Sequence, residues 1–332
     1  MILKLTLDTK VSFKILNKYI LVVLRFMVSY LKSLFERTEL VLLIAVIVPL
    51  IFNINVHFLE SWISFILGIV MFLSIRPFFS QKINALRDWK KILLSILLSY
   101  VLLSGVYLFV ASLFFPLSSD YFIGFLLLAI VPPAVSIIPL CYLTKCDIKV
   151  ADTAIFVSYL LALIIIPLTS YLVFGKNFDF LQLLSSLAVI IVVPTILAYF
   201  SRHSKSKIFS YTKLLTGLLI GLVLLISVSL NRSSLLNVAD VGIRHILFIN
   251  LGVIFGLGLL TYYISKKFVS QGDAIDYMLY ATQKNEATGI AIALVLFNHA
   301  VAIPLISAVV VQFLFFIFFE RFVLRHYDSK TG

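Results

Sequence analysis

Long apolar runs, separated by short polar stretches, follow one another along this chain from residue 39 onwards. A helix needs about 20 mainly apolar residues to cross a bilayer. On that criterion the pattern predicts ten spans, near residues 39–54, 57–76, 91–115, 120–143, 150–174, 178–200, 208–230, 243–265, 273–297 and 300–324. No polar stretch between them is long enough to fold separately. We therefore expect an all-α polytopic membrane protein, with one membrane domain over residues 38–325 and a short cytoplasmic tail, residues 326–332.

Composition and charge support this interpretation. Hydrophobic residues make up 62% of the 332 and charged residues 13%, against about 45–50% and about 25% in soluble domains. Loops rich in lysine and arginine favour the cytoplasmic side, and 23 of the 27 such residues fall in alternate segments, beginning with residues 1–37. We expect both termini in the cytoplasm and a multi-pass protein of the plasma (inner) membrane. The net charge of +12 then reflects topology and anionic lipid, with no nucleic-acid partner, and the oligomeric state stays open.

The first 37 residues are apolar but carry regularly placed positive charges. Lys14, Lys18, Arg25 and Lys32 fall on one face of a helix, a pattern typical of a helix that lies in the membrane interface. No small-residue cleavage site follows a clean apolar core, so we do not expect a cleaved signal peptide. An interfacial segment over residues 1–37 is our prediction, and a crossing by residues 13–31 is the alternative.

The chain has two cysteines, Cys141 and Cys146. They form no CxxC motif and have no histidine partner in the sequence around them. The spacing therefore predicts neither a disulfide nor a zinc site.

Ten spans divide into two sets of five, residues 38–175 and residues 176–325. Because each set has an odd number of spans, the second set is inserted upside down relative to the first, as in an inverted repeat. The fourth span of each set is also the one in which helix-breaking or polar residues interrupt the apolar run. Interruptions at matching places in two inverted halves indicate a binding site near the membrane midplane.

The first interruption contains three prolines within eight residues, Pro132, Pro133 and Pro139. Each proline lacks an amide donor and disfavours helical geometry in the residue before it, so carbonyl groups one turn back lose their partners. In hydrocarbon those carbonyls must face protein, water or an ion. We predict a half-helix that begins at Pro133 and presents free amides to a cavity, with Pro132, Pro133 and Ser136 in the binding site. A continuous proline-kinked helix is the alternative.

The second interruption is the polar run over residues 282–289. One charge at the bilayer centre costs on the order of 3 kcal/mol, so ionisable residues there normally face a cavity or a partner. A water-exposed loop between two short spans is the alternative. The candidate binding residues of this run are Thr282, Gln283, Lys284, Asn285, Glu286 and Thr288.

With their flanks, these interruptions resemble the bile acid:sodium symporter superfamily, which includes arsenite exporters and is distantly similar to auxin efflux carriers. Residues 67–74, 132–143 and 286–294 carry the resemblance, which covers nearly the whole chain after residue 38. It implies a core bundle in which spans four and nine cross, and a panel-like bundle of spans one, two, six and seven. It also implies secondary-active transport of a small organic solute, an organic anion, by alternating access. Neither the solute's identity nor the direction of transport follows from it.

The chain departs from its sodium-coupled relatives at the interruptions. Where they carry a Ser-Asn pair, this chain has Ile137 and Ile138, which offer sodium no side-chain oxygen. The family's glutamate falls on Thr282 and its glutamine falls on Glu286. The cysteine that follows the break proline in arsenite exporters is replaced by Pro133, which disfavours an arsenite role. We therefore expect no cofactor and no sodium coupling, with sodium-coupled symport as the alternative.

Lys284 can instead serve as a built-in cation. We expect its ammonium to be held by Glu286, by Ser136 and by the carbonyls that the prolines free. The Lys284–Glu286 pair would exchange a proton as the cavity opens to each side in turn. A fixed structural ion pair is the alternative.

An intramembrane enzyme acting on a lipid or prenyl substrate is the rival class. Such enzymes hold magnesium with several aspartates, and Asp273 and Asp276 are the one comparable pair. We interpret them as acids at a helix N-terminus, where they meet the positive end of the helix dipole. The histidines form neither a metal-binding nor a catalytic-triad pattern. A receptor is the third class, and the sequence predicts no attached soluble domain that would favour it. We therefore expect a transporter rather than an enzyme.

Overall fold

The computed structural model describes residues 38–80, 88–144, 146–174, 179–204, 206–237 and 239–324. Over these ranges the chain is helical, without strands. The predictions for residues 1–37 and for the tail, residues 326–332, lie outside the described residues. The α-helices are α2 (Thr38–Ile51), α3 (Ile63–Ser80), α4 (Trp89–Leu97), α5 (Ser104–Phe114), α6 (Asp120–Ile130), α7 (Ile137–Thr144), α8 (Ile148–Phe174), α9 (Phe180–Leu187), α10 (Val193–Ser201), α11 (Thr212–Leu230), α12 (Arg232–Leu236), α13 (Val241–Ser265), α14 (Gln271–Tyr280), α15 (Glu286–Leu296) and α16 (His299–Phe318).

Shorter turns of other geometry extend several of these helices. The 3₁₀ turns η1 (His57–Trp62) and η5 (Lys207–Tyr211) precede α3 and α11. The π-helical turns η2 (Leu98–Leu103), η4 (Ala188–Val192) and η6 (Phe319–Leu324) continue α4, α9 and α16. Such turns therefore join α4 to α5, and α9 to α10, as longer helical rods.

Six helical stretches of the described chain are long and apolar enough to cross a membrane. They are His57–Phe79, Trp89–Phe114, Ile148–Phe174, Phe180–Ser201, Val241–Ser265 and His299–Val323. Shorter apolar helices are Asp120–Ile130, Leu214–Leu230 and Glu286–Leu296. The structure is thus that of an all-α protein with several apolar helices of membrane-spanning length, and the ten-span arrangement of two inverted sets of five stays a prediction.

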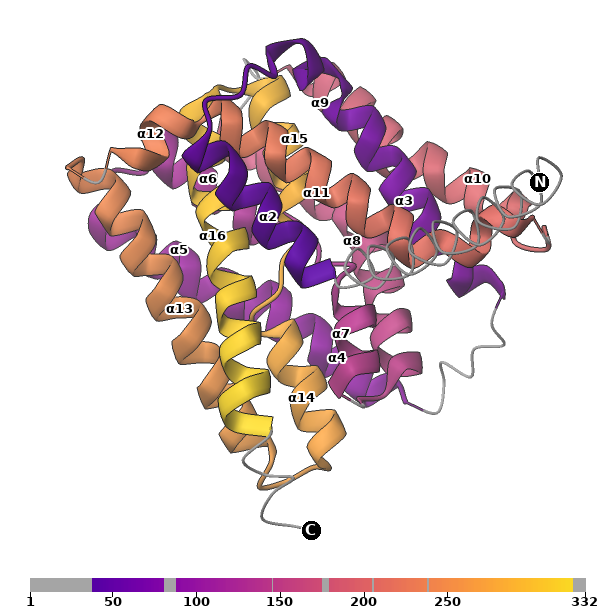
Figure 1. Ribbon diagram of the computed structural model, residues 1–332. Coiled ribbons are helices and arrows are strands. Elements are labelled where there is room, and N and C mark those ends of the chain that lie inside the picture. Colours follow the sequence, from indigo (N-terminus) through magenta and orange to yellow (C-terminus); the bar gives the residue numbers. More distant parts are fainter. Residues whose placement is uncertain are drawn as a thin grey trace, which may run out of the picture.

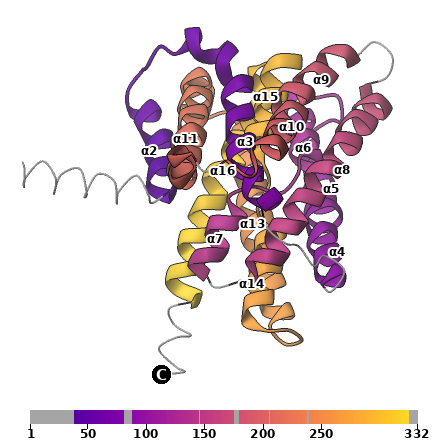
Figure 2. The same ribbon diagram turned by 90° about the vertical axis from the view of Figure 1, so that its right-hand side faces the viewer.

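One group of helices, which we call the panel, consists of α2, α3, α9, α10 and α11. Within it α11 packs against α2 and α3, and α10 packs against α3; Figure 2 shows α2 and α11 side by side. Gly68 of α3 permits close packing, because a Cβ there would lie 2.9 Å from the carbonyl oxygen of Val189. Small residues allow helix backbones to approach each other in this way.

The remaining long helices form a second group, which we call the core bundle. Here α16 packs against α6, α13 and α15, while α5 packs against α6; Figure 1 shows α13, α14 and α16 together toward the C-terminal end. A Cβ on Gly124 of α6 would overlap the carbonyl oxygen of Val301 and the ring of Pro304. The helix pair α6 and α16 therefore depends on glycine at this position.

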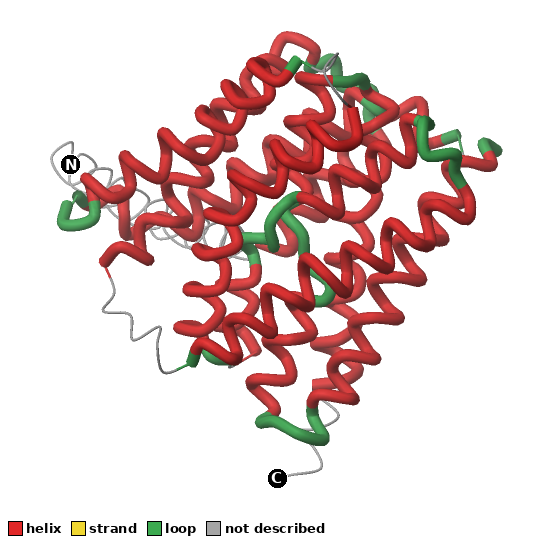
Figure 3. Tube along the Cα trace, turned by 180° about the vertical axis from the view of Figure 1, so that it is seen from behind, coloured by secondary structure: helices red, strands yellow, loops and turns green. Residues whose placement is uncertain are grey.

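The two interrupted segments meet in the middle of the molecule. Helix α6 ends at Ile130 before α7 begins, and α14 ends at Tyr280 before α15 begins. The Ala134 amide donates to the Gln283 carbonyl at 3.4 Å, and the Asn285 amide donates to the Pro132 carbonyl at 2.8 Å. Figure 3 shows the two non-helical segments against each other at the centre.

The half-helix after the first interruption begins later than the sequence predicted. We expected it to start at Pro133, but α7 starts at Ile137. The amides of Ile137 and Ile138 are not free, since they donate to the carbonyls of Ala134 and Val135, at 3.2 Å each. Pro133 is instead paired with Lys284 across the break, and a turn then leads into α7.

The cysteine prediction was also wrong, because Cys141 and Cys146 form a disulfide. Helix α7 ends at Thr144, and the chain then folds back so that the Cys146 amide donates to the Cys141 carbonyl at 3.2 Å. This return brings the two Cα atoms to 4.8 Å. The bond depends on how α7 ends, which the spacing of the cysteines does not reveal.

Candidate functional site

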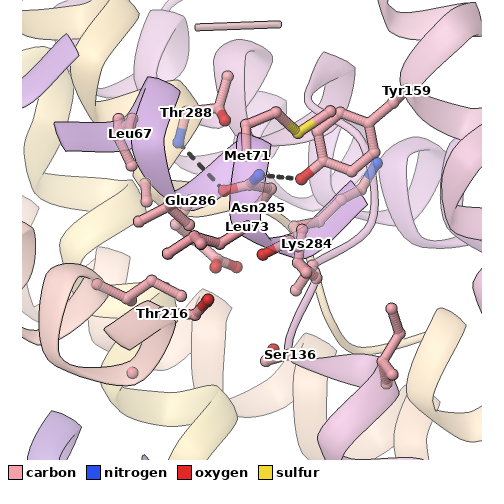
Figure 4. Close-up of a pocket in the computed structure, with 18 of the residues that line it drawn as sticks. Leu67, Met71, Leu73, Ser136, Tyr159, Thr216, Lys284, Asn285, Glu286 and Thr288 are labelled. Carbon is pink, nitrogen blue, oxygen red and sulfur yellow. Dashed lines mark hydrogen bonds between the residues drawn. The ribbon is translucent and has the colours of Figure 1, made fainter. Parts of the chain in front are cut away.

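A cavity of about 290 Å³ lies between the panel and the core bundle, beside the interruptions. Figure 4 shows lining residues that come from α3, α8, α11 and both interrupted segments. The lining continues to Pro77, Ile148 and Thr212, which lie at the end of α3 and at the starts of α8 and α11. We call this the open end of the cavity.

Polar contacts between panel and core bundle lie at the opposite end of the helices, whereas at the open end Phe78 of α3 stacks on Phe156 of α8 with ring centres 3.8 Å apart. Glu60, in the turn before α3, lies 3.6 Å from the Nε2 atom of His299 at the start of α16. The Gln182 side chain of α9 donates to the Val295 carbonyl of α15 at 3.2 Å. We call this the closed end. The cavity lining thus extends to the open end and does not include these residues of the closed end.

Lys284 is fully buried, and its ammonium is bound by the end of helix α6. The Nζ atom donates to the carbonyl oxygens of Ala129 at 2.9 Å and Val131 at 3.0 Å, and lies 4.6 Å from the centre of the Tyr100 ring. The Ala129 carbonyl lacks its normal helical donor because residue 133 is proline, which has no N–H. The C-terminal end of a helix also carries partial negative charge. The Lys284 ammonium thus supplies hydrogen-bond donors and positive charge to the C-terminal end of α6.

Glu286 is the first residue of α15, the half-helix that follows the second interruption. It is 5% exposed and lies in the first turn of α15, where the helix dipole favours negative charge. Its Oε1 atom accepts a hydrogen bond from the Gln312 amide of α16. Among the ion pairs of the described residues, Glu286 and Lys284 are not joined, so the contact that we expected between them is replaced by separate partners.

Asn285 fixes the start of α15 from the same segment. Its side-chain oxygen accepts from the Thr288 amide at 3.2 Å, and its side-chain nitrogen donates to the Tyr159 hydroxyl of α8. Both bonds are drawn in Figure 4. The interrupted segment is therefore anchored to the core bundle on the cavity side.

The residues that the sequence indicated divide into two sets. Those that line the cavity are Ser136, Lys284, Asn285, Glu286 and Thr288. Pro132, Pro133, Thr282 and Gln283 do not line it and are buried. The Thr282 hydroxyl bonds back to the Met278 carbonyl at 2.8 Å, while the Gln283 carbonyl takes part in the pairing of the two breaks. These four shape the crossing and do not face the cavity.

The cavity also includes polar residues that the sequence reasoning missed. They are Ser74, Asp152, Tyr159, Thr216 and Gln312, from α3, α8, α11 and α16. Only Asp152 carried a recognisable signal, since an ionisable residue inside an apolar span marks a functional position by default. The hydroxyl and amide residues look like ordinary members of membrane helices.

Asp273 and Asp276 have different hydrogen-bond partners. Asp273 accepts from Lys91 at 2.7 Å and from the helix-capping Ser270 hydroxyl at 2.8 Å. Asp276 is buried instead, and accepts from the Ser95 hydroxyl at 3.2 Å. Together with Cys141 and Cys146, Asp276 makes the one close group of metal-ligand residue types in the described chain, but both sulfurs are bonded to each other.

Comparison with known proteins assigns the chain to a family. Residues 34–323 match the family model of the SBF-like CPA transporter family. This match confirms the predicted resemblance to bile acid:sodium symporters, and with the apolar helices it makes the protein a multi-pass integral membrane protein of a transporter family. No curated protein matches the chain. The match extends over most of the sequence, and the chain therefore belongs to the SBF-like CPA transporter family.

Proposed function

We propose that the protein is a secondary-active transporter that moves a small organic solute by alternating access. The cavity is the observation that carries this proposal. It lies against both interrupted segments, between panel and core bundle, and its lining extends to the open end. Rocking of the panel against the core bundle would break the contacts at the closed end and expose the same cavity to the other side. Such movement around a fixed midplane site is the general mechanism of transporters built from inverted repeats.

The topology proposed from the sequence fits this mechanism. It has ten spans in two inverted sets, residues 38–175 and residues 176–325, with both termini in the cytoplasm. Under this topology the open end faces the cytoplasm, because the segment before α8 and the segment before α11 are on the inner side. The positive charges of those segments support the orientation.

For coupling, we propose protons with Lys284 as a built-in cation. Its ammonium donates to the Ala129 and Val131 carbonyls, which is the coordination that an inorganic cation at the break would take from them. Ile138 lines the cavity beside the break and offers no oxygen ligand. Sodium is therefore the less favoured coupling ion.

Two observations bear on the chemical class of the solute. The family resemblance implies an organic anion, whereas the lining contains the carboxylates Asp152 and Glu286. The intramembrane-enzyme alternative receives less support, because the two aspartates have separate partners. Asp273 is paired with Lys91, and Asp276 is buried and bonded to Ser95.

Uptake by proteoliposomes tests the proposal. The purified protein is reconstituted with a mixture of labelled organic acids and amines, and uptake is compared under a sodium gradient and under a pH gradient. We expect accumulation of at least one solute that responds to the pH gradient and not to sodium. Lys284→Met should abolish the pH response while the protein stays folded. Sodium-driven uptake by the unmodified protein, or an unchanged pH response in Lys284→Met, would refute the coupling. The absence of solute movement under every gradient would refute transport.

A further inference from the structure

One carboxylate of the cavity has no partner among the described residues. Asp152, in the second turn of α8, is 6% exposed and lines the cavity. Within the described part of the chain its side chain accepts no hydrogen bond and forms no ion pair. Its carboxylate oxygens are not among the buried atoms that lack a partner, so they are accessible from the cavity. The protein thus holds a negative charge in the cavity wall that a ligand can compensate.

The surroundings of Asp152 include a recess of ligand-group size. A side pocket of about 10 Å³, lined by Ser74, Asp152 and Tyr159 among others, adjoins the main cavity. A volume of about 10–15 Å³ is what one water molecule needs, and a primary ammonium group is similar in size. The Ser74 hydroxyl is buried without a hydrogen-bond partner. Carboxylate and hydroxyl together offer acceptors to the N–H groups of one small cation.

The remaining charges of the lining favour a cation over an anion. Lys284 is the basic residue among the lining residues with described side chains, and its ammonium is already bound by the Ala129 and Val131 carbonyls. Glu286 adds a second carboxylate. The described lining therefore carries two carboxylates against one ammonium, so an organic anion would meet an excess of negative charge.

The main cavity can hold the rest of the ligand. Its walls are mostly aliphatic, with Leu67, Val70 and Leu224 among the lining residues. A dehydrated metal ion needs several oxygen ligands at close range, and a cavity of about 290 Å³ with apolar walls does not provide that. An amphiphilic molecule places its apolar body here. The buried Thr216 hydroxyl on α11, which also lacks a partner, remains for a second polar group.

Resting on the proposed transport function, we propose that the solute is a small amphiphilic primary amine, whose ammonium group enters the recess and pairs with Asp152. Ser74 accepts a second hydrogen bond from that group, and the apolar body lies between the panel and the core bundle. Because the recess admits one small group, a trimethylated ammonium is excluded from it. The charge of Asp152 sets the class of solute, and the size of the recess selects the primary amine.

Calorimetric titration of the full chain in lipid nanodiscs tests this with four matched probes: 2-phenylethylammonium, its N,N,N-trimethyl analogue, 2-phenylethanol and 3-phenylpropionate. Empty nanodiscs provide the correction for partition into lipid. We expect binding of the primary ammonium and at least about tenfold weaker binding of the other three, because a charge-assisted hydrogen bond accounts for about tenfold to about hundredfold in affinity. Asp152→Asn should weaken binding of the primary ammonium by a similar factor, and Ser74→Ala should weaken this binding less.

Asp88→Asn is the matched control, because Asp88 lies in the segment before α4, does not line the cavity, and makes no capping hydrogen bond. It should leave binding unchanged. Asp152→Asn should not lower the melting temperature of the ligand-free protein, since it removes an uncompensated charge, and this separates lost binding from misfolding. Preferential binding of 3-phenylpropionate, equal binding of the trimethyl analogue, or full ammonium affinity in Asp152→Asn would overturn the amine proposal. Transport of an organic acid in the uptake assay would do so while leaving the proposed function intact.

Discussion

Removal of Lys284 together with Ser104 measures how strongly the ammonium stabilises the broken end of α6. The Ala129 carbonyl has two donors, the Lys284 ammonium at 2.9 Å and the Ser104 hydroxyl at 2.6 Å. The Val131 carbonyl accepts a hydrogen bond from the Lys284 ammonium at 3.0 Å. A buried carbonyl left without a donor costs about 1–3 kcal/mol. Lys284→Met therefore deprives Val131 of this donor, whereas Ser104→Ala leaves both carbonyls bonded.

The expected energies follow from this sharing. Lys284→Met should lower the free energy of unfolding by at most about 3 kcal/mol, because relief of the buried ammonium offsets part of the loss. Ser104→Ala should cost about 1 kcal/mol. The double variant also deprives Ala129 of both donors, so its cost should exceed the sum of the single costs by about 1 kcal/mol or more.

Titration with a denaturing detergent, followed by circular dichroism, gives the unfolding free energies of the four proteins. Ser112→Ala is the control, since its hydroxyl bonds the Phe109 carbonyl on an exposed part of α5. It should be additive with Lys284→Met. If Ser104→Ala is additive too, within about 0.5 kcal/mol, the ammonium does not share the Ala129 carbonyl and our account of the break is incorrect.

Two further predictions address packing and topology. Gly124→Ala should lower the unfolding free energy by about 1–3 kcal/mol, because the added methyl overlaps the Val301 carbonyl and Pro304. Gly105→Ala, where nothing lies within 4 Å of the added methyl, should be neutral or stabilising by up to about 1 kcal/mol; equal effects of the two in thermal unfolding would contradict the packing. Reporter fusions at Asn177 and Ser204 should lie on opposite sides of the membrane, and a signal from the same side for both would rule out the ten-span topology.

The helices could be predicted closely because lipid leaves the backbone few alternatives. In hydrocarbon, each apolar segment must satisfy its own backbone groups, so a run of apolar residues translates almost directly into a helix. Where a span was predicted over residues 243–265, the structure has the helix Val241–Ser265. The two interruptions were visible for the related reason that prolines remove donors and charged residues avoid lipid.

Other features depend on the direction of side chains, which the sequence does not contain. Lys284 and Glu286 lie two residues apart in the chain, and this proximity suggested an ion pair. In the structure the Lys284 side chain extends to carbonyls 153 and 155 residues away, and Glu286 is bonded to Gln312. The Cys141–Cys146 bond likewise depends on the fold of the chain after α7. Contacts between elements decide these partners, and spacing does not predict them.

Lys284 and Asp152, two ionisable residues of the cavity lining, differ in whether their side chains have partners among the described residues. The Lys284 ammonium is hydrogen-bonded inside the protein, to the Ala129 and Val131 carbonyls at the end of α6. Its presence therefore completes the interrupted helix, whether or not a solute is bound. Asp152 lines the cavity with neither a donor nor a cation in the described chain, so its carboxylate is available to water or to a solute that enters the cavity. Sequence reasoning gave weight to the interruptions because they break a local rule. Asp152 breaks the same rule against charge in an apolar span, but it lies in an uninterrupted helix, where only the cavity reveals what its charge faces.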